Sequence, residues 1–409
     1  MSDSDLVEPP RLNVPPWSET LRKDRLSTGD PAPFFAVRST NNANFQFSSA
    51  GGRYLVLCFF GSLVGERNRR TFELLTTRRR ERFDDFTMSF FGVSMDPDDE
   101  QQGRARQSLP GIRHFWDFDG GVTSLYAGGE PASLPSAAEA GFTLVIDPFM
   151  RVIANIPFGE PEQHADAVSA VLDRLPAPSL HAGAPTPAPV LMLPRVFEPE
   201  LCRALIDLYE WRGGGDSGFM KDENGRTVAV LDHSFKRRSD VSLEDSPEYE
   251  SYRAAIRARV VRRILPEIQK AFQFQITRME RYLIACYDSG TGGFFKAHRD
   301  NTTLGTVHRR FAVTINLNAE EYEGGDLRFP EFGDQTYRAP TGGCVVFSCG
   351  LLHEARPVTR GRRYACLPFL YDEEGAAVRA RNRELVNLDV VNRNAAAAGA
   401  AIARGAKVP

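Results

Sequence analysis

The chain has 409 residues, 42% of them hydrophobic and 25% charged, so it can bury a sizeable core and should divide into two or three domains. Fifty Lys and Arg residues against 53 Asp and Glu give a formal net charge of -3, which argues against bulk attraction to nucleic acid or an anionic membrane. The basic run at 76–82 is interpreted as a solvated helix face. This composition is typical of a soluble enzyme.

Cysteine usage and the first residues bear on the compartment. The six cysteines contain no CxxC pair and are too sparse for a disulfide scaffold, which favours a reducing compartment. Residues 1–17 lack a basic stretch followed by an apolar one, as a secretory signal would have, and no apolar run approaches the length that spans a membrane. We therefore expect a cytoplasmic protein with no membrane or nucleic-acid partner.

The first predicted domain follows an N-terminal extension, 1–25, and covers 26–178. Within it a helical stretch at 70–83 alternates with strand-like runs, and this alternation predicts an α/β domain with a largely parallel sheet. The strand-like runs lie at 53–60, 88–95 and 142–147.

The clearest break in composition is the Pro/Ala-rich stretch 175–190, from which we place a linker at 179–190. The second predicted domain, 191–373, begins with helical segments at 198–212 and 247–272. Short strands separated by Gly, Asp and Pro turns then dominate and predict an antiparallel barrel or jelly roll. Residues 374–409 should form a C-terminal helix and a low-complexity tail.

The first half carries an ordered set of sequence pieces that resembles the peroxiredoxins of the AhpC/TSA type. These pieces are "GDPAPFFAV" (29–37), "GRYLVLCFFG" (52–61), "GVSMDPDDE" (92–100), "FWDFDGGVTSLYA" (115–127) and "FTLVIDPFMRVIA" (142–154). The resemblance implies a thioredoxin-like fold. In that family a cysteine thiolate attacks peroxide from the loop and first helical turn after the strand, where nearby amides and a cation lower its pKa.

The corresponding segment here, "GSLVGERNRRTF" (61–72), contains no cysteine. Cys58 lies earlier, inside the apolar strand, where a buried and inert thiol is expected. Without a thiolate, peroxide reduction has no nucleophile. We therefore expect a redox-inactive domain that serves dimerisation, partner docking or coverage of the neighbouring site, with a homodimer through this domain as one possibility.

The second half contains a candidate metal site in "GGFFKAHRDNTT" (292–303). Residues two apart on a strand project from the same face, so His298 and Asp300 could offer an imidazole nitrogen and a carboxylate oxygen to one point. Taken alone, the pair is equally compatible with a solvated strand end. A further histidine, His353, closes a second strand-turn unit, and Arg363 follows inside an apolar strand. Two histidines and a carboxylate on one face of Fe(II) leave open positions for an oxoacid and dioxygen.

Residues of about 190–373 resemble the 2-oxoglutarate/Fe(II)-dependent dioxygenases, specifically the prolyl 4-hydroxylase-like branch, which implies a double-stranded β-helix (jelly roll). The resemblance implies that His298, Asp300 and His353 are the iron ligands and that Arg363 anchors 2-oxoglutarate by a bidentate salt bridge. The matched pieces, in order, are "LMLPRVFEPELCRALIDL", "FKRRSDV", "IACYDSGTGGFFKAHRDN", "VTINLN", "YEGGDLRFPEFG", "PTGGCVVF" and "LHEARPVTRGRRYA".

Two further residues are assigned to the cosubstrate. Tyr287 matches the family tyrosine that hydrogen-bonds 2-oxoglutarate, although it could simply be a core residue. Asn316 is expected on the barrel interior together with Thr314, because the strand "VTINLN" should alternate its faces. Arg362 is the alternative anchor, but the alternation of the strand favours Arg363 inward.

Three other polar residues near these motifs have open interpretations. His308 has no matching role in the family and is expected on the surface or in a loop. His233 could approach a substrate or be structural. Arg238 could bind an acidic substrate or form a salt bridge at the rim of the site.

The sequence thus predicts an Fe(II)- and 2-oxoglutarate-dependent dioxygenase that uses dioxygen to oxidise, most simply to hydroxylate, a C–H bond of a prolyl, peptidyl or small-molecule substrate with release of succinate and CO2. The alternatives are a thiol peroxidase of the redoxin type, which the missing cysteine disfavours, and a metal-binding scaffold without catalysis, which Arg363 disfavours. The substrate, the oxidised position and the role of the first domain are not determined by the sequence.

Overall fold

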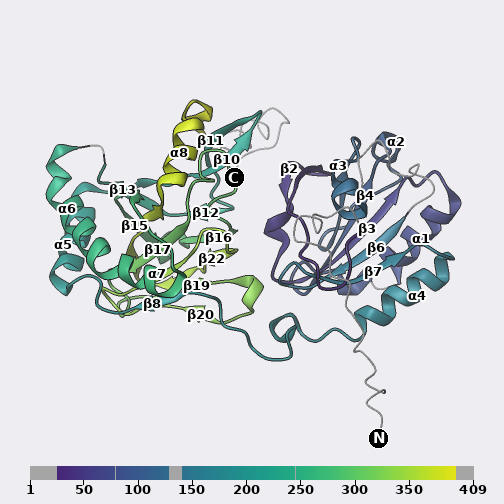
Figure 1. Ribbon diagram of the computed structural model, residues 1–409, viewed down its shortest axis with the longest axis horizontal. Helices are drawn as coiled ribbons and strands as arrows, with labels where there is room; N and C mark the ends of the chain where they lie inside the picture. Colours follow the sequence, from purple (N-terminus) through teal and green to yellow (C-terminus); the bar gives the residue numbers. More distant parts are fainter. Residues whose placement is uncertain (1–24, 79, 129–140, 245, 393–409) are drawn as a thin grey trace, which may run out of the picture.

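The structure is a computed structural model with two halves that differ in architecture (Figure 1). The described residues are 25–78, 80–128, 141–244 and 246–392. Within this part of the chain, no helix combines the length and the apolar character needed to cross a bilayer.

The N-terminal half contains one sheet flanked by helices. Its strands are β1 Ala36–Ser39, β2 Asn42–Gln46, β3 Tyr54–Gly61, β4 Met88–Ser94, β5 Ile112–Trp116, β6 Phe142–Ile146 and β7 Val152–Pro157. Its helices are η1 Phe47–Ala50, α1 Glu66–Thr77, η2 Arg80–Arg82, α2 Pro97–Gln101, α3 Gly121–Ala127 and α4 Pro161–Leu172, and η4 Pro178–Leu180 follows them.

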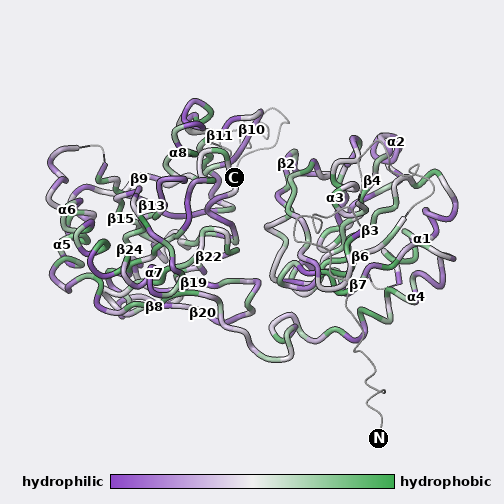
Figure 2. Tube along the Cα trace, in the orientation of Figure 1, coloured by the Kyte–Doolittle hydropathy of each residue, from purple (hydrophilic) through white to green (hydrophobic). Residues whose placement is uncertain are grey.

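The sheet of this half has the strand order β2-β1-β5-β4-β3-β6-β7. All eight residues of β3 are buried, because the strand lies centrally and is covered on both faces. Figure 2 shows the corresponding alternation of hydrophobic and hydrophilic residues along the covering helices α1 and α4. The arrangement confirms the predicted thioredoxin-like fold.

Two expectations for this half need correction. The sheet is mixed rather than largely parallel: only β3–β4 and β4–β5 are parallel, whereas β6, β7 and the β1–β2 hairpin run antiparallel to their neighbours. Short turns join β1 to β2 and β6 to β7, which permits antiparallel pairing without a crossover helix. The helix predicted at 70–83 instead begins at Glu66 and ends at Thr77, before the short helical turn η2.

The C-terminal half is a jelly roll with a helical layer on one side. Its helices are α5 Pro199–Arg212, η5 Pro247–Tyr249, α6 Glu250–Arg259, the π-helical turn η6 Val260–Ile264, α7 Leu265–Phe272, η7 Ser289–Thr291, η8 Pro330–Phe332, α8 Glu373–Arg381 and η9 Arg383–Leu385.

The strands of this half are short, as the spacing of its turns predicts. They are β8 Leu191–Leu193, β9 Gly215–Asp216, β10 Phe219–Glu223, β11 Arg226–Leu231, β12 Lys236–Arg237, β13 Ser239–Ser242, β14 Arg278–Glu280, β15 Leu283–Asp288, β16 Phe294–His298, β17 Phe311–Asn316, β18 Glu323–Gly324, β19 Leu327–Arg328, β20 Thr336–Tyr337, β21 Cys344–Ser348, β22 His353–Ala355, β23 Val358–Arg360, β24 Arg362–Cys366, β25 Phe369–Tyr371 and β26 Val386–Asn392.

Two facing sheets form the roll. The larger follows the path β14-β25-β17-β24-β15-β13-β9, with β21 and β8 attached, and the smaller has the order β12-β16-β22-β19-β20. One face of the larger sheet packs against α5, α6 and α7 through residues such as Leu205, Ile256 and Ile315. In Figure 1 these helices lie away from the N-terminal half, whereas β16 and β22 lie on the side that faces it. The predicted jelly roll with flanking helices is confirmed.

The end of the described chain adds an element that the sequence did not indicate. After the expected helix, here α8, residues Val386–Asn392 form β26, which pairs in parallel with β11. The low-complexity tail from 393 onward lies outside the described residues. The domain limits 26–178, 179–190 and 191–373 remain our proposal.

A buried histidine in β5 predicts a pH dependence of stability. His114 is completely buried, and this burial lowers its pKa from 6.5 to about 4. The unfolded chain therefore binds a proton at His114 below pH 6.5 that the folded chain does not, so stability is lost as the pH falls from 6.5 toward 4. At pH 5 this single group should cost about 2 kcal/mol of unfolding free energy relative to pH 7.

We expect His114→Phe, which keeps a ring of similar shape, to lose less stability than the wild type between pH 7 and pH 5. Urea unfolding of both proteins at the two pH values measures this difference. An equal loss in the two proteins would contradict the assignment to His114.

Candidate metal centre

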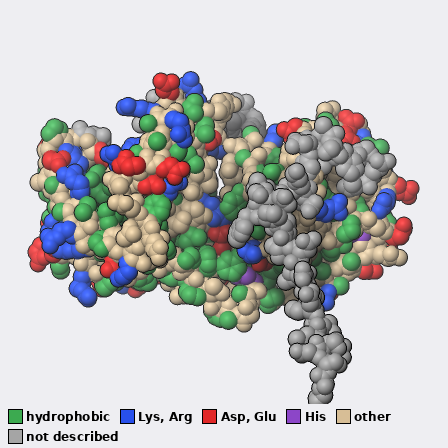
Figure 3. All heavy atoms as spheres, viewed as in Figure 1, with side chains coloured by type: hydrophobic (Ala, Val, Ile, Leu, Met, Phe, Trp, Pro, Cys, Tyr) green, Lys and Arg blue, Asp and Glu red, His purple; other side chains and the backbone are tan. Residues whose placement is uncertain are grey.

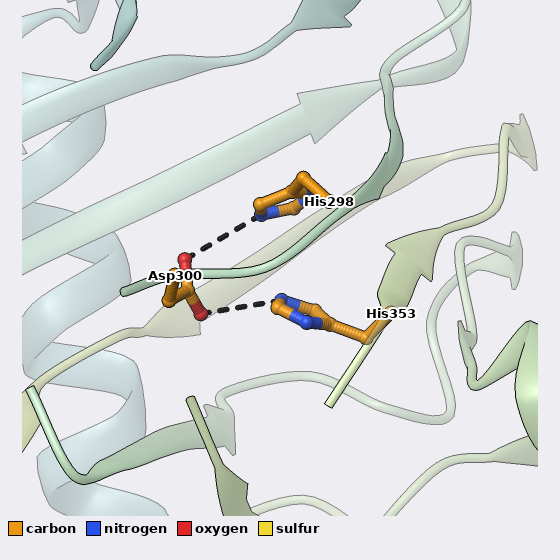
Figure 4. Close-up of side chains that lie close together, drawn as sticks. All are labelled: His298, Asp300 and His353. Atoms are coloured by element: carbon orange, nitrogen blue, oxygen red, sulfur yellow. Dashed lines mark ion pairs between the residues drawn. The ribbon is translucent and has the colours of Figure 1, made fainter. Parts of the chain in front are cut away.

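His298, Asp300 and His353 come together at the edge of the smaller sheet (Figure 4). His298 is the last residue of β16, and His353 is the first of β22; the two are direct partners across this antiparallel pair. Asp300 lies two residues beyond β16 in a turn, so the strand carries only one member of the His-x-Asp pair. The backbone N–H of Asp300 donates to the carbonyl of Cys349 at 3.0 Å, which attaches this turn to the loop before His353.

The three side chains direct their acceptor atoms at one another. His298 Nε2 lies 3.5 Å from Asp300 Oδ1, and His353 Nε2 lies 3.3 Å from Asp300 Oδ2. Each Nδ1 lies at hydrogen-bond distance from a backbone carbonyl, 2.8 Å from Lys296 O and 3.0 Å from Leu351 O. A carbonyl only accepts, so each Nδ1 must carry the proton, and in the neutral rings each Nε2 presents a lone pair.

The electrostatics of the cluster favour a cation. Burial, followed by the neighbouring His353, lowers the pKa of His298 to about 4. Burial alone would raise the pKa of the Asp300 carboxyl, but the charge and N–H groups of His353 and His298 in their protonated forms hold that pKa well below its usual value. At neutral pH His298 therefore supplies a neutral nitrogen next to an ionised carboxylate. This is the protonation state in which such groups bind a metal ion.

Aromatic rings hold the two imidazoles in place. Phe295 stacks on His298 with ring centroids 3.6 Å apart, and Phe347 contacts the ring of His353 edge-on at 4.6 Å. The hydrogen bonds from Nδ1 to the backbone carbonyls further restrict the orientation of the same rings. Such contacts set ligand orientation before a metal binds.

The structure distinguishes the two candidate arginines. Arg362 is about half exposed and pairs with Glu210 and Asp288. Arg363 is 3% exposed; it donates to the carbonyl of Gly325 at 2.7 Å, and its Nε has no hydrogen-bond partner among the described residues. A buried guanidinium without a carboxylate partner is costly, so the surroundings of Arg363 suit an anionic ligand.

Tyr287 and Asn316 lie on the same face of the larger sheet as Arg363. Tyr287 is the direct cross-strand partner of Arg363, whose guanidinium lies 5.1 Å from the tyrosine ring centre. Asn316 is paired with Ala365, two residues along β24 from Arg363. Its amide nitrogen donates to Ala339, and its buried Oδ1 has no partner within the described chain. Tyr287 is also a core residue, since it packs with Phe295.

A cleft of about 2050 Å³ opens onto the metal cluster between the two halves, and Figure 3 shows the hollow between them. His298 and Asp300 line it from the C-terminal half, and Asn44 and Ser48 line it from the N-terminal half. Its volume exceeds that of a typical small-ligand pocket, roughly 300–1,000 Å³. Arg363 lies deeper, inside the roll, and does not line this cleft.

The remaining candidate residues have structural partners. His308 lies in a turn as expected, but it is buried rather than at the surface, because Nε2 contacts Glu280 at 3.1 Å and the ring contacts Tyr371. His233 is partly exposed and lies 3.2 Å from Asp216.

Arg238 forms a salt bridge, but a buried one rather than one at the rim. It pairs with Asp240 at 2.6 Å and reaches the hydroxyl of Tyr287 at 3.3 Å. Burial lowers the pKa of Arg238, but the nearby Asp240 carboxylate raises it by more, so the pKa is raised overall. This pairing leaves less of its charge available to an acidic substrate.

Sequence reasoning missed the ion pair between Arg299 and Glu331. Both side chains are buried, and Arg299 Nη2 lies 2.7 Å from Glu331 Oε1. Arg299 occupies the position between the two ligands of the His-x-Asp pair. Its location within that pair was the only available signal, since the partner is 32 residues away.

A match to a known family covers the cluster. Residues 282–371 match the sequence model of the 2OG-Fe(II) oxygenase superfamily. This segment includes His298, Asp300, His353 and Arg363, and the match confirms the resemblance stated for the second half of the sequence.

Curated relatives of this chain are hydroxylases by name. The chain is 30% identical over 117 residues to a PKHD-type hydroxylase of Synechococcus sp. (strain JA-2-3B'a(2-13)), covering 26% of this chain and 51% of that protein. It is 26% identical over 213 residues to a PKHD-type hydroxylase of Polaromonas sp. (strain JS666 / ATCC BAA-500), covering 49% of this chain and 86% of that protein. The chain thus spans about half the length of the Synechococcus relative.

Solved structures similar to each half also exist. A prolyl-4-hydroxylase of Pseudomonas putida aligns with 50% of this chain and 98% of its own, at 19% identity and a TM-score of 0.34. The peroxidoxin BcpB of Mycobacterium tuberculosis aligns with 37% of this chain and 100% of its own, at 20% identity and a TM-score of 0.32.

The thiol of Cys58 has the environment that the sequence predicted. It is fully buried in β3, and burial raises its pKa to about 12 despite a hydrogen bond with Thr143. The other five cysteines are also buried and free. At neutral pH a thiol with this pKa contains almost no thiolate.

We therefore expect Cys58→Ser to leave the rate of hydrogen peroxide consumption unchanged, at the level of free cysteine or below. The native protein should also react with a thiol reagent only after it unfolds. A peroxidase rate that disappears in Cys58→Ser would show instead that the N-terminal half is catalytic.

Proposed function

We propose that the protein is an Fe(II)- and 2-oxoglutarate-dependent dioxygenase that hydroxylates a C–H bond of a peptidyl, prolyl or small-molecule substrate and releases succinate and CO2. The observation that carries this proposal is the convergence of His298, Asp300 and His353, whose ligand atoms all lie within 4.8 Å of one another. Two imidazoles and one carboxylate on one side of a metal are the donor set typical of non-haem Fe(II) oxygenases.

The donor chemistry of the cluster supports a resident cation. Both Nδ1 atoms are committed to backbone carbonyls, so two lone pairs and a carboxylate face a common point without a hydrogen between them. A divalent metal at that point would satisfy all three groups. His298, Asp300 and His353 would hold it, and their fixed rings would leave the side toward the cleft open.

Arg363 supports 2-oxoglutarate as the cosubstrate. Its buried guanidinium donates to the backbone carbonyl of Gly325 and interacts with the hydroxyl of Tyr322, but its Nε has no hydrogen-bond partner among the described residues. A distal carboxylate would complete this fork, because the planar guanidinium matches carboxylate geometry. Tyr287 and Asn316, on the same face of the sheet, would contact the bound molecule through their polar ends.

Together with dioxygen, bound iron and 2-oxoglutarate supply an oxidant strong enough to attack an unactivated C–H bond. The protein residues position the metal ligands and the substrate and shield the site from water. Phe295 and Phe347 hold the ligand rings, and the burial of Arg363 inside the roll would keep water away from a salt bridge between its guanidinium and the cosubstrate carboxylate. A substrate bound in the cleft would place its reacting C–H bond next to His298 and Asp300, which line the cleft.

The substrate is proposed at the level of its class. The cleft is larger than a small molecule needs, which favours a peptide or protein segment as the substrate. The names of the similar proteins, PKHD-type hydroxylases and a prolyl-4-hydroxylase, agree with hydroxylation and with a prolyl residue as one candidate. Dimerisation through the N-terminal half stays a prediction.

The first test concerns the metal ligands. We expect His298→Ala and His353→Ala each to abolish tight Fe(II) binding in an anaerobic titration and to abolish substrate-dependent succinate release, because two remaining ligands hold the ion poorly. His164→Ala, in α4 of the N-terminal half, which Figure 1 shows on the side away from β16 and β22, is the control and should bind iron normally. Normal activity in either ligand variant would refute the assignment.

The second test compares neighbouring arginines. Arg363→Leu should raise the 2-oxoglutarate concentration needed for half-maximal turnover by orders of magnitude, because loss of one partner of a buried charge-assisted pair costs roughly 3–5 kcal/mol. Arg362→Leu, one residue earlier on the exposed face, should have little effect. Steady-state kinetics in 2-oxoglutarate measure both. The opposite ranking would place the wrong arginine in the site.

A further inference from the structure

The metal cluster is attached to the N-terminal half through the residue between its first two ligands. The guanidinium of Arg299 is buried and forms two bonds to Glu331, with Nη1 3.2 Å from Oε2 and Nη2 2.7 Å from Oε1. The same group donates to the backbone carbonyl of Ser48 in η1, from Nε at 3.3 Å and from Nη2 at 3.1 Å. Arg299 therefore contacts both halves at once.

Glu331 carries the connection onward to the third ligand. Its Oε2 accepts from the backbone N–H of Leu352 at 3.2 Å, and Leu352 immediately precedes His353. Arg299 also donates to the carbonyl of Gly350 in the same loop. The ion pair thus holds the backbone on both sides of the cluster: between His298, at the end of β16, and Asp300, in the turn that follows, and next to His353, at the start of β22.

The short helix η8, which contains Glu331, packs against the N-terminal half through each of its three residues. A Cβ on Gly52 would lie only 2.5 Å from Pro330 Cβ, and one on Gly51 only 3.1 Å from Glu331 Cγ. The ring of Phe332 contacts Phe149 edge-on with centroids 4.9 Å apart. The position of Glu331 is therefore set by contacts with the N-terminal half.

We propose that the N-terminal half positions the metal ligands, with Arg299 and Glu331 as the positioning residues that transmit its contact to His298, Asp300 and His353. A second set of contacts agrees with this role. The guanidinium of Arg299 lies 4.8 Å from the ring centre of Phe34, and Asn44 donates to the carbonyl of Asp222 at 3.2 Å. The N-terminal half would then act as a structural support for the neighbouring site. This inference rests on the function proposed above.

The decisive experiment uses a change in the N-terminal half only. Gly51 has φ -58° and ψ 168°, which alanine adopts without strain, but the added methyl would press on the Glu331 side chain. Gly51→Ala should therefore weaken Fe(II) binding several-fold in an anaerobic titration of the full-length protein. Gly65→Ala is the matched control, because nothing lies within 4 Å of its Cβ, and it should bind Fe(II) as the wild type does.

Variants of the Arg299–Glu331 ion pair test the same connection by changes in the C-terminal half. Arg299→Met and Glu331→Gln should each raise the Fe(II) dissociation constant by about 10-fold or more, as loss of groups that orient metal ligands does elsewhere. Arg299→Lys should recover part of the affinity, because it keeps the charge but not the fork. Arg263→Met, which removes an ion pair with Glu198 in the helical layer, should lower thermal stability without changing iron affinity.

The double variant Arg299→Met/Glu331→Met separates positioning from the effect of an unpaired buried charge. Weak iron binding in the double variant supports positioning, whereas recovery to the wild-type affinity overturns it. Hydrogen exchange of the metal-free protein provides a readout independent of activity: the Leu352 amide should exchange faster in Gly51→Ala and Glu331→Gln but not in Gly65→Ala.

The outcomes distinguish the two proposals. If the wild-type protein fails to bind Fe(II), the proposed function itself is refuted. If the wild-type protein binds Fe(II) and Gly51→Ala, Glu331→Gln and Arg299→Met bind it equally well, only the positioning role is refuted.

Discussion

The mutual approach of three hydrogen-bond acceptors, His298, Asp300 and His353, is the constraint on which the rest of the C-terminal half depends. Both imidazoles donate from Nδ1 to the backbone carbonyl two residues earlier in the chain. Their Nε2 atoms therefore direct lone pairs at the Asp300 carboxylate. Such an arrangement is unfavourable without a shared cation. The fold must therefore hold it rigidly, which explains the stacked aromatic rings and the pairing of His298 with His353 across β16 and β22.

A second buried charge, that of Arg363, makes the interior of the roll suited to an anionic ligand. Alternation along β24 places Arg362 in solvent with acidic partners. It places Arg363 inside, where the guanidinium donates to the backbone carbonyl of Gly325 and forms no salt bridge with a described residue. Removing a guanidinium from water without a counter-ion is costly. The metal cluster at the mouth of the roll is thus suited to a cation, and Arg363 inside the roll is suited to an anion. A dicarboxylate could chelate the cation with one end and pair with Arg363 through the other.

The N-terminal half has a thioredoxin-like fold but lacks a cysteine where the peroxiredoxins carry their peroxide-reactive thiol. Its segment after β3 has no cysteine, and the one cysteine in β3 is held as a neutral thiol by burial. Its contacts with η8 and Arg299 instead connect its backbone to the loops that carry the metal ligands. Docking of one domain onto the ligand loops of another makes the geometry of the site depend on both.

The sequence by itself determined features that depend on local order: the alternating strands, the helices of the second half and the inward direction of Arg363 rather than Arg362. It also predicted that His298, Asp300 and His353 form a metal site, and the structure places these three residues together. These follow from period-two alternation and from residue type, which act over a few positions. Only the tertiary structure decided that the first sheet is mixed, that β26 returns to β11, that His308 is buried against Glu280, and that Glu331 and Ser48 meet at Arg299. Each of these is a contact between residues far apart in the chain, and its partner is selected by packing and charge pairing in three dimensions, which no local pattern encodes.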